Sequence, residues 1–118
     1  MAMMEAKTSA FVETFGDSPY VRALDFFLMF PSFDYSKTQV AREAGVSRIT
    51  MDSIWSQLLK EGFIKKTRDI GRAELFKLNV ENPRIKALMD TDFRLSQAFA
   101  QEQLAAEKIP AKNKRAQG

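Results

Sequence analysis

The chain of 118 residues contains no cysteine and no histidine. Their absence excludes disulfide bonds, thiol nucleophiles, imidazole acid–base catalysis and the zinc sites built on these ligands. Paired carboxylates on a common face, a glycine-rich phosphate loop and metal-ligand spacing are missing from the sequence as well. We therefore expect a protein that is not an enzyme and that holds no metal and no cofactor.

Glycine and proline are scarce, at five and four residues, while hydrophobic residues make up 45% of the chain and ten of them are phenylalanine. This composition argues against a disordered or fibrous chain and supplies enough apolar surface for one core. The most apolar segment, residues 26–31, is too short to cross a bilayer, and the first residues show no export signal. We expect a cytoplasmic, nucleoid-associated protein with no membrane contact.

The net charge of +3 is small, but it is unevenly distributed. Residues 1–35 hold two basic and five acidic side chains, residues 36–78 hold nine and five, and residues 79–118 hold seven and five. Four cations, Lys65, Lys66, Arg68 and Arg72, lie within eight residues of the central segment. A basic segment of this kind attracts polyanions, although a cluster of charges is also common on solvated faces.

Capping signals divide the chain into helices. Ser18 followed by Pro19 predicts a helix over residues 19–30. A capping box that begins at Ser36 predicts a short second helix, which Gly45 ends. Ser47 caps a third helix that ends at residues 61–62. Its predicted buried stripe consists of Met51, Ile54, Trp55, Leu58 and Leu59.

Two extended runs follow around Gly71, residues 63–70 and 73–78, and predict a β-hairpin. Asn82 and Pro83 open a long final helix that we expect to end near Glu107. The fold class is therefore mainly α with a small β-hairpin, a winged helix-turn-helix plus a long C-terminal helix. We divide the chain into an N-terminal arm (1–17), a winged helix-turn-helix DNA-binding domain (18–81), a C-terminal dimerisation helix (82–107) and a flexible basic tail (108–118).

The order of elements carries the functional prediction. A short helix, a tight turn and an amphipathic helix form a helix-turn-helix, in which the second helix enters the major groove of DNA. Residues 39–55 have the features that this motif needs: Ala41 is small where the helices cross, Gly45 turns the chain, and apolar residues face inward. The segment before Pro19 stays open: it forms a short packed helix, an arm toward a partner or a loose tail.

Three stretches and one residue of the chain carry a family resemblance: Phe15-Gly-Asp-Ser-Pro19, Gly45-Val-Ser-Arg48, Ile70-Gly-Arg-Ala73 and Asn79. With these residues the chain resembles small prokaryotic, especially archaeal, winged helix-turn-helix transcriptional regulators of the MarR/ArsR-like type. The resemblance covers roughly residues 19–80 and implies a cytoplasmic DNA-binding protein, commonly a homodimer and often a repressor. The chain departs from metal-sensing members because it has no cysteine or histidine, and the sequence names no small-molecule effector.

The exposed N-terminal face of the third helix combines an arginine, short hydroxyls and a small apolar group, which suit base edges and a thymine methyl. Arg48 is the best placed to read a guanine, because its guanidinium can bond O6 and N7 together; a phosphate contact or a free position in solvent is the alternative. Asp52 either holds Arg48 in place or accepts from a cytosine. The full predicted base-reading set is Ser47, Arg48, Ile49, Thr50, Asp52 and Ser53.

Phosphate contacts are predicted at two places. Lys37 and Thr38 stand at the positive end of the second helix, and the hairpin presents the cations. Arg72 lies nearest the tip and is expected to be closest to a groove. The full predicted backbone and wing set is Lys37, Thr38, Lys65, Lys66, Arg68 and Arg72.

The final helix has an apolar face broader than one core contact needs, which predicts a two-fold homodimer on double-stranded DNA. Polar residues interrupt that face, so a helix that folds back over its own domain, or docks another protein, remains the alternative. For the whole chain, the alternative function is a winged-helix protein-interaction or DNA-organising (partition) module, and RNA binding is less favoured because the aromatic residues fall at core spacing. The predicted dimer interface is Ile85, Leu88, Met89, Leu95 and Phe99.

Overall fold

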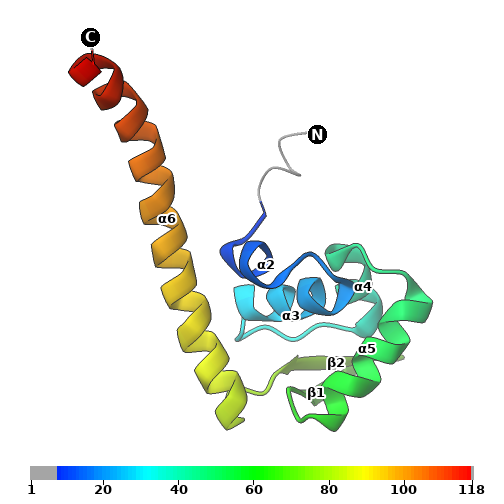
Figure 1. The fold of residues 1–118 in the computed structure, drawn as a ribbon. Coiled ribbons are helices and arrows are strands. Elements are labelled where there is room, and N and C mark those ends of the chain that lie inside the picture. Colours follow the sequence, from blue (N-terminus) through cyan, green and yellow to red (C-terminus); the bar gives the residue numbers. More distant parts are fainter. Residues whose placement is uncertain (1–7, 118) are drawn as a thin grey trace.

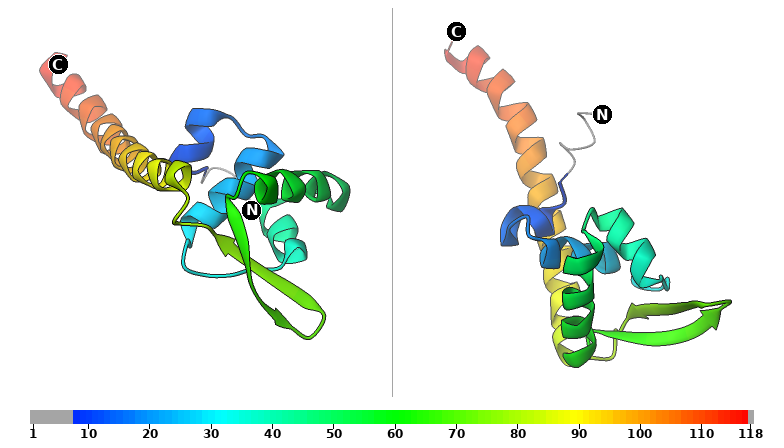
Figure 2. Two further views of the ribbon diagram at one scale, coloured as in Figure 1. Left: turned by 90° about the horizontal axis from the view of Figure 1, so that it is seen from below. Right: turned by 90° about the vertical axis from the view of Figure 1, so that its right-hand side faces the viewer.

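The computed structural model describes residues 8–117, with side chains described as far as residue 107. In this part of the chain, five helices and one hairpin follow one another (Figure 1). The helix-turn-helix and the hairpin form a compact body, and the last helix runs past one side of it and projects beyond it (Figures 1 and 2). The elements are α2 (Ala10–Phe15), α3 (Pro19–Met29), α4 (Lys37–Ala44), α5 (Arg48–Lys60), β1 (Ile64–Ile70), β2 (Ala73–Leu78) and α6 (Pro83–Gln117).

The predicted capping signals begin the helices of the body. The hydroxyl oxygen of Ser18 accepts from the N–H three residues on at 3.1 Å, and Ser36 and Ser47 do the same at 3.1 and 3.2 Å. Each serine thereby satisfies an N–H that has no partner inside its helix. Gly45 ends α4 at φ 68°, in the left-handed region where a side chain is strained. Local chemistry therefore sets the length of the helix-turn-helix.

The core lies between α3, α4, α5 and the hairpin. Phe27 of α3 is fully buried and packs against Trp55 of α5, with ring centroids 5.8 Å apart. Of the predicted stripe on α5, Met51, Ile54, Trp55 and Leu58 are buried. Leu59 is 43% exposed, so its place in that stripe was wrong. With 100° of rotation per residue, Leu59 lies at the edge of the buried face of α5, whereas Leu58 lies near its centre.

The hairpin is attached to the body by one side. Ile64 of β1 pairs with Leu78 of β2, and both are buried, whereas the other six residues of β1 are exposed. Tyr35, just before α4, pairs with Phe76 on the free side of β2 through hydrogen bonds of 2.7 and 2.8 Å. β2 is therefore flanked on both sides, and β1 forms the outer edge of the wing.

Where it is described, the N-terminal segment forms a short packed helix, which is the first of the three predicted possibilities. α2 packs against α3 and α6, and its residues Ala10, Phe11 and Val12 are buried. Figure 2 shows α2 lying between the body and the long helix. Residues 1–7 of the predicted arm lie outside the described residues. The short helix thus covers part of α6 from within the same chain.

The first turns of α6 belong to the body. Ile85 is fully buried in the common core, and Leu88 and Met89 pack against that core. Arg84 ties the start of α6 to the end of α5, because its guanidinium lies 2.8 Å from a carboxylate oxygen of Glu61. The prediction that Ile85 forms a dimer interface is therefore corrected, because its side chain is buried in the core of its own chain.

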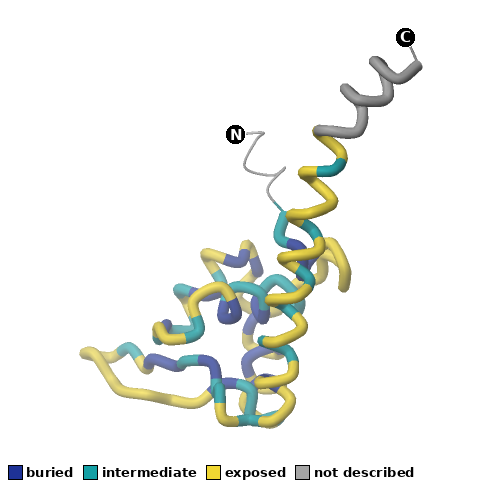
Figure 3. The backbone as a smooth tube through the Cα atoms, turned by 90° about the vertical axis from the view of Figure 1, so that its left-hand side faces the viewer, coloured by how far each residue is buried: buried dark blue, intermediate teal, exposed yellow. Residues whose placement is uncertain are grey.

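Farther along, α6 separates from the body and becomes exposed (Figure 3). Phe93 and Leu104 are 62% and 58% exposed, while Leu95 and Phe99 are half-buried. The helix continues to Gln117, past the end predicted near Glu107. Alanine, lysine, arginine and glutamine, which favour helices, make up most of this last stretch, whereas Pro110 within it opposes one. The predicted division into domains, including the basic tail, stays a prediction.

Two carboxylates lie at the junction of α3 and α6. Burial raises the pKa of Asp25 on α3, while a hydrogen bond with Ser9 opposes this rise. Burial also raises the pKa of Asp92 on α6, and the negative charge of Asp25 raises it further. The negative charge of Asp25 therefore disfavours the ionised form of Asp92 where α6 meets the body.

Candidate nucleic-acid interface

The turn between α4 and α5 is held from outside by Arg22 of α3. Its Nε donates to the carbonyl of Ala44 at 2.8 Å, and a second nitrogen donates to the carbonyl of Gly45 at 3.1 Å. A third nitrogen forms an ion pair of 2.9 Å with Asp17. Carbonyls at a helix end have no partner within the helix, so a guanidinium stabilises them. The sequence analysis missed Arg22, because its two carbonyl partners lie more than 20 residues away.

The N-terminal face of α5 is free of the body. Arg48, Ile49, Thr50, Asp52 and Ser53 are all exposed, and Ile49 reaches 82% exposure. A single exposed isoleucine is ordinary on a protein surface, but beside an arginine and short hydroxyls it supplies the apolar group that contact with a thymine methyl needs. The structure thus places these five predicted residues together on one accessible surface.

Ser47 has a different local role from the other members of the predicted base-reading set. Its hydroxyl caps α5 and also lies 3.0 Å from the hydroxyl of Thr50. The pair occupies the cap of the helix and orients both hydroxyls. Ser47 therefore contributes mainly to the start of the helix.

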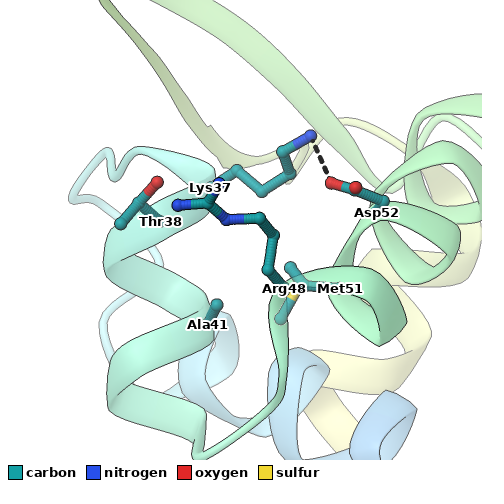
Figure 4. Close-up of a pocket in the computed structure, with 6 residues that line it drawn as sticks. All are labelled: Lys37, Thr38, Ala41, Arg48, Met51 and Asp52. Atoms are coloured by element: carbon teal, nitrogen blue, oxygen red, sulfur yellow. Dashed lines mark ion pairs between the residues drawn. The ribbon is translucent and has the colours of Figure 1, made fainter.

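Arg48 extends across a depression between α4 and α5, toward Lys37 and Thr38 (Figure 4). The depression has a volume of about 370 Å³, and Ala41 and Met51 complete its lining. Lys37 forms an ion pair of 2.8 Å with Asp52 across it (Figure 4). Asp52 therefore pairs with Lys37, and the predicted contact between Asp52 and Arg48 was wrong. Among the described residues Arg48 makes no ion pair.

The hairpin cations fall into two classes. Lys66 lies 3.0 Å from Asp69 and 3.4 Å from Glu74, and these carboxylates raise the pKa of Lys66. Lys65 and Arg72 form no ion pair with any described residue, and Arg72 lies beside Gly71 at the tip. Lys65 and Arg72 are therefore better placed to bind an anion from outside the protein than Lys66, whose charge is already balanced by two carboxylates.

Arg68 belongs to the paired class. Its guanidinium binds Asp34, which lies in the segment before α4. The pairing raises the pKa of Arg68, and hydrogen bonds from Arg68 and Thr67 lower the pKa of Asp34. The sequence analysis missed Asp34, because only the fold brings residue 34 next to residue 68.

Neither a metal site nor a membrane-spanning helix is found among the described residues. No three acidic side chains among them gather in a way that would hold a metal ion. No described helix carries an apolar stretch that would span a bilayer. The polar surface formed by α4, α5 and the hairpin is therefore the strongest candidate for a functional site.

Comparisons with protein-family models and with curated proteins gave no match. Solved structures do match. The PcaV transcriptional regulator from Streptomyces coelicolor has 25% identity and a TM-score of 0.51, with 84% of this chain and 77% of that chain covered. MepR, a transcription regulator of a Staphylococcus aureus multidrug efflux pump, has 12% identity and a TM-score of 0.57, with 84% and 76% covered.

A third match is the adhesin competence repressor AdcR from Streptococcus pyogenes, at 15% identity and a TM-score of 0.52, with 81% and 75% covered. These matched structures are transcriptional regulators and not enzymes. The similarity of these structures to the helices and the hairpin of this chain confirms the predicted fold class. The chain therefore has a winged helix-turn-helix fold that is similar to the fold of these transcriptional regulators.

Proposed function

We propose that the chain is a sequence-specific double-stranded DNA-binding protein that acts as a homodimeric transcriptional repressor in the cytoplasm. The observation that carries the proposal is the surface of α5, where Arg48 and the exposed Ile49 stand together beside a wing that carries Lys65 and Arg72. These three cations form no ion pair with any described residue. Solved structures of the same fold are transcriptional regulators, which supports this reading.

In this proposal α5 lies in the major groove. Arg48 contacts a guanine, and Ile49 contacts a thymine methyl. Lys65 and Arg72 contact phosphates or the adjacent minor groove. The ion pair between Lys37 and Asp52 keeps the carboxylate from repelling phosphates, so Asp52 can remain on this surface.

The homodimer is proposed from the part of α6 that the body leaves uncovered. Phe93 and Leu104 are largely exposed, and Leu95 and Phe99 are half-buried, so an apolar surface remains beyond the contact with α2. A second copy would bury it and set two α5 helices on successive major grooves, on an approximate inverted repeat. Sedimentation of the wild type and of a Leu95→Glu, Phe99→Glu double variant tests this, and a wild type that is monomeric at tens of micromolar contradicts it.

The test of DNA binding uses a duplex selected from random sequences. The protein is titrated with this duplex, with hairpin RNA and with a single strand at two salt concentrations. We expect tight duplex binding that falls steeply as salt rises. Equal weak binding to all three, or no binding, contradicts the proposal.

A matched pair of variants separates base reading from charge. Arg48→Ala is expected to relax sequence preference and to cost about 1–3 kcal/mol on the selected duplex. Arg42→Ala removes the same charge from the same motif, but Arg42 already lies 3.9 Å from Glu43 at the far end of α4. If both variants lose the same affinity on all sequences, Arg48 is not a base-reading residue.

A protein-interaction module is the second candidate, and one observation favours it. Phe30 and Phe33 stack on each other with ring centroids 5.8 Å apart, yet they are 45% and 60% exposed. Exposed aromatic pairs are enriched at protein interfaces. The same titration distinguishes the candidates, because this function requires no affinity for duplex DNA.

A further inference from the structure

Asp34 is bound by two successive residues of the wing. Arg68 donates from Nε to Oδ2 at 3.0 Å and from a terminal nitrogen to Oδ1 at 3.2 Å, which is a two-pronged contact. The hydroxyl of Thr67 lies 2.5 Å from Oδ2. The side chain of Asp34 is only 17% exposed, although Arg68 is 61% exposed. Charge-assisted, two-pronged hydrogen bonds of this kind fix orientation as well as distance.

A bulge in β1 makes this contact possible. Lys66 pairs with Phe76 and Arg68 pairs with Leu75, so Thr67 is the extra residue between them. In a regular strand, neighbouring side chains point to opposite faces. Because two residues of the bulge oppose one residue of β2, Thr67 and Arg68 both reach the same carboxylate. The bulge and Asp34 therefore act as one unit.

The contact joins the wing to the helix-turn-helix. Asp34 precedes Tyr35, whose backbone is paired with β2, and it stands two residues before the cap of α4. Residues 65–70 of β1 are exposed and have no apolar packing of their own. Among the described residues, the side chains of residues 65–72 make no other ion pair or hydrogen bond to the segment 31–60. Apart from its pairing with β2 and the buried Ile64, the outer strand thus has this carboxylate as its side-chain link to the segment before α4.

We propose that Asp34 is a positioning residue for the wing: through Thr67 and Arg68 it fixes the angle at which the hairpin leaves the body, and so places Arg72 relative to Arg48. This inference rests on the proposed function in DNA binding. It also reassigns Arg68 from a phosphate contact to a support of the wing, because its guanidinium is already committed to Asp34.

The first arm of the test is a mutant cycle on duplex DNA. Asp34→Asn keeps the shape of the side chain and removes its charge. We expect this change to weaken binding about fivefold to tenfold in the wild type and in an Arg48→Ala background, but less than about twofold in an Arg72→Ala background. Asp90→Asn is the matched control, because it removes a carboxylate paired with Arg94 at 3.1 Å on α6 and should leave affinity unchanged.

Two results of this mutant cycle would overturn the proposal. An equal loss in the Arg72→Ala and Arg48→Ala backgrounds overturns the proposal, because Asp34 would then act on something other than the wing tip. An unchanged affinity of Asp34→Asn overturns it as well.

The second arm needs no DNA and measures backbone amide hydrogen exchange. In Asp34→Asn we expect residues 64–75 to exchange at least about tenfold faster while α5 is unchanged. Equal acceleration in both segments, or none, overturns the role of Asp34 in the wing. A wild type that binds no duplex overturns the proposed function instead, and the exchange result then decides independently whether Asp34 holds the hairpin.

Discussion

Replacing Arg72 and Lys66 one at a time tests whether ion pairs within the protein remove wing cations from phosphate binding. Arg72 is unpaired among the described residues, whereas Lys66 lies within 3.4 Å of two carboxylates. Each phosphate neutralised by a protein cation adds about 0.9 to the slope of log affinity against log salt concentration. In a dimer, Arg72→Ala should therefore reduce the slope by about 1.8.

This difference is large enough to measure. Between 50 and 200 mM salt, a slope change of about 1.8 makes the loss of affinity about twelvefold smaller. Lys66→Ala should lower affinity, since Asp69 and Glu74 lose their cation, but it should leave the slope unchanged. Fluorescence anisotropy of a labelled duplex at five salt concentrations gives both quantities. Equal slope changes for the two variants would refute the reasoning.

Three further predictions concern stability and are measured by urea or thermal unfolding. Ile85→Ala should lower the free energy of unfolding by about 3 kcal/mol at every protein concentration, because the residue is fully buried in its own chain; Phe93→Ala should change it by less than about 0.5 kcal/mol in the monomer. Asp92→Asn should raise the free energy of unfolding at pH 7 by a few tenths of a kcal/mol, because the raised pKa of Asp92 means that the folded chain binds the proton more tightly than the unfolded chain. The wild type recovers this stability as pH falls through the raised pKa, so the advantage of the variant should vanish below the ordinary pKa of an aspartate. Gly45→Ala should cost about 1 kcal/mol through its left-handed φ of 68° alone, because a Cβ there meets open space, and a larger loss would indicate a steric contact.

Local signals explain which parts of the fold were predictable. Ser18, Ser36 and Ser47 cap their helices through N–H groups three residues away, so each start can be found within a short window. Gly45 and Gly71 mark the turn and the hairpin tip for the same reason. The exposure of Leu59 could not be predicted from such local signals, because it depends on which residues pack beside α5.

The site was predictable only as a set of exposed residues. Arg48 is recognisable because its position on α5 follows from helical spacing. The contacts of Lys37 with Asp52, and of Arg68 with Asp34, join residues 15 and 34 positions apart. No periodicity relates such positions, so the sequence could show the cations but not which of them are already neutralised. The same holds for Ile85, whose apolar character suits a core and an interface equally.

The way α6 is seated also has a mechanical consequence. Ile85 is buried at one end, as a pivot, and Phe99 stands about 21 Å farther along a single rod. A rotation of about 5° at the pivot moves Phe99 by about 2 Å, and a gap of that size removes most of the attraction between packed side chains. In a helix of this length, even a small tilt of the body would become a lost or gained contact at the far end.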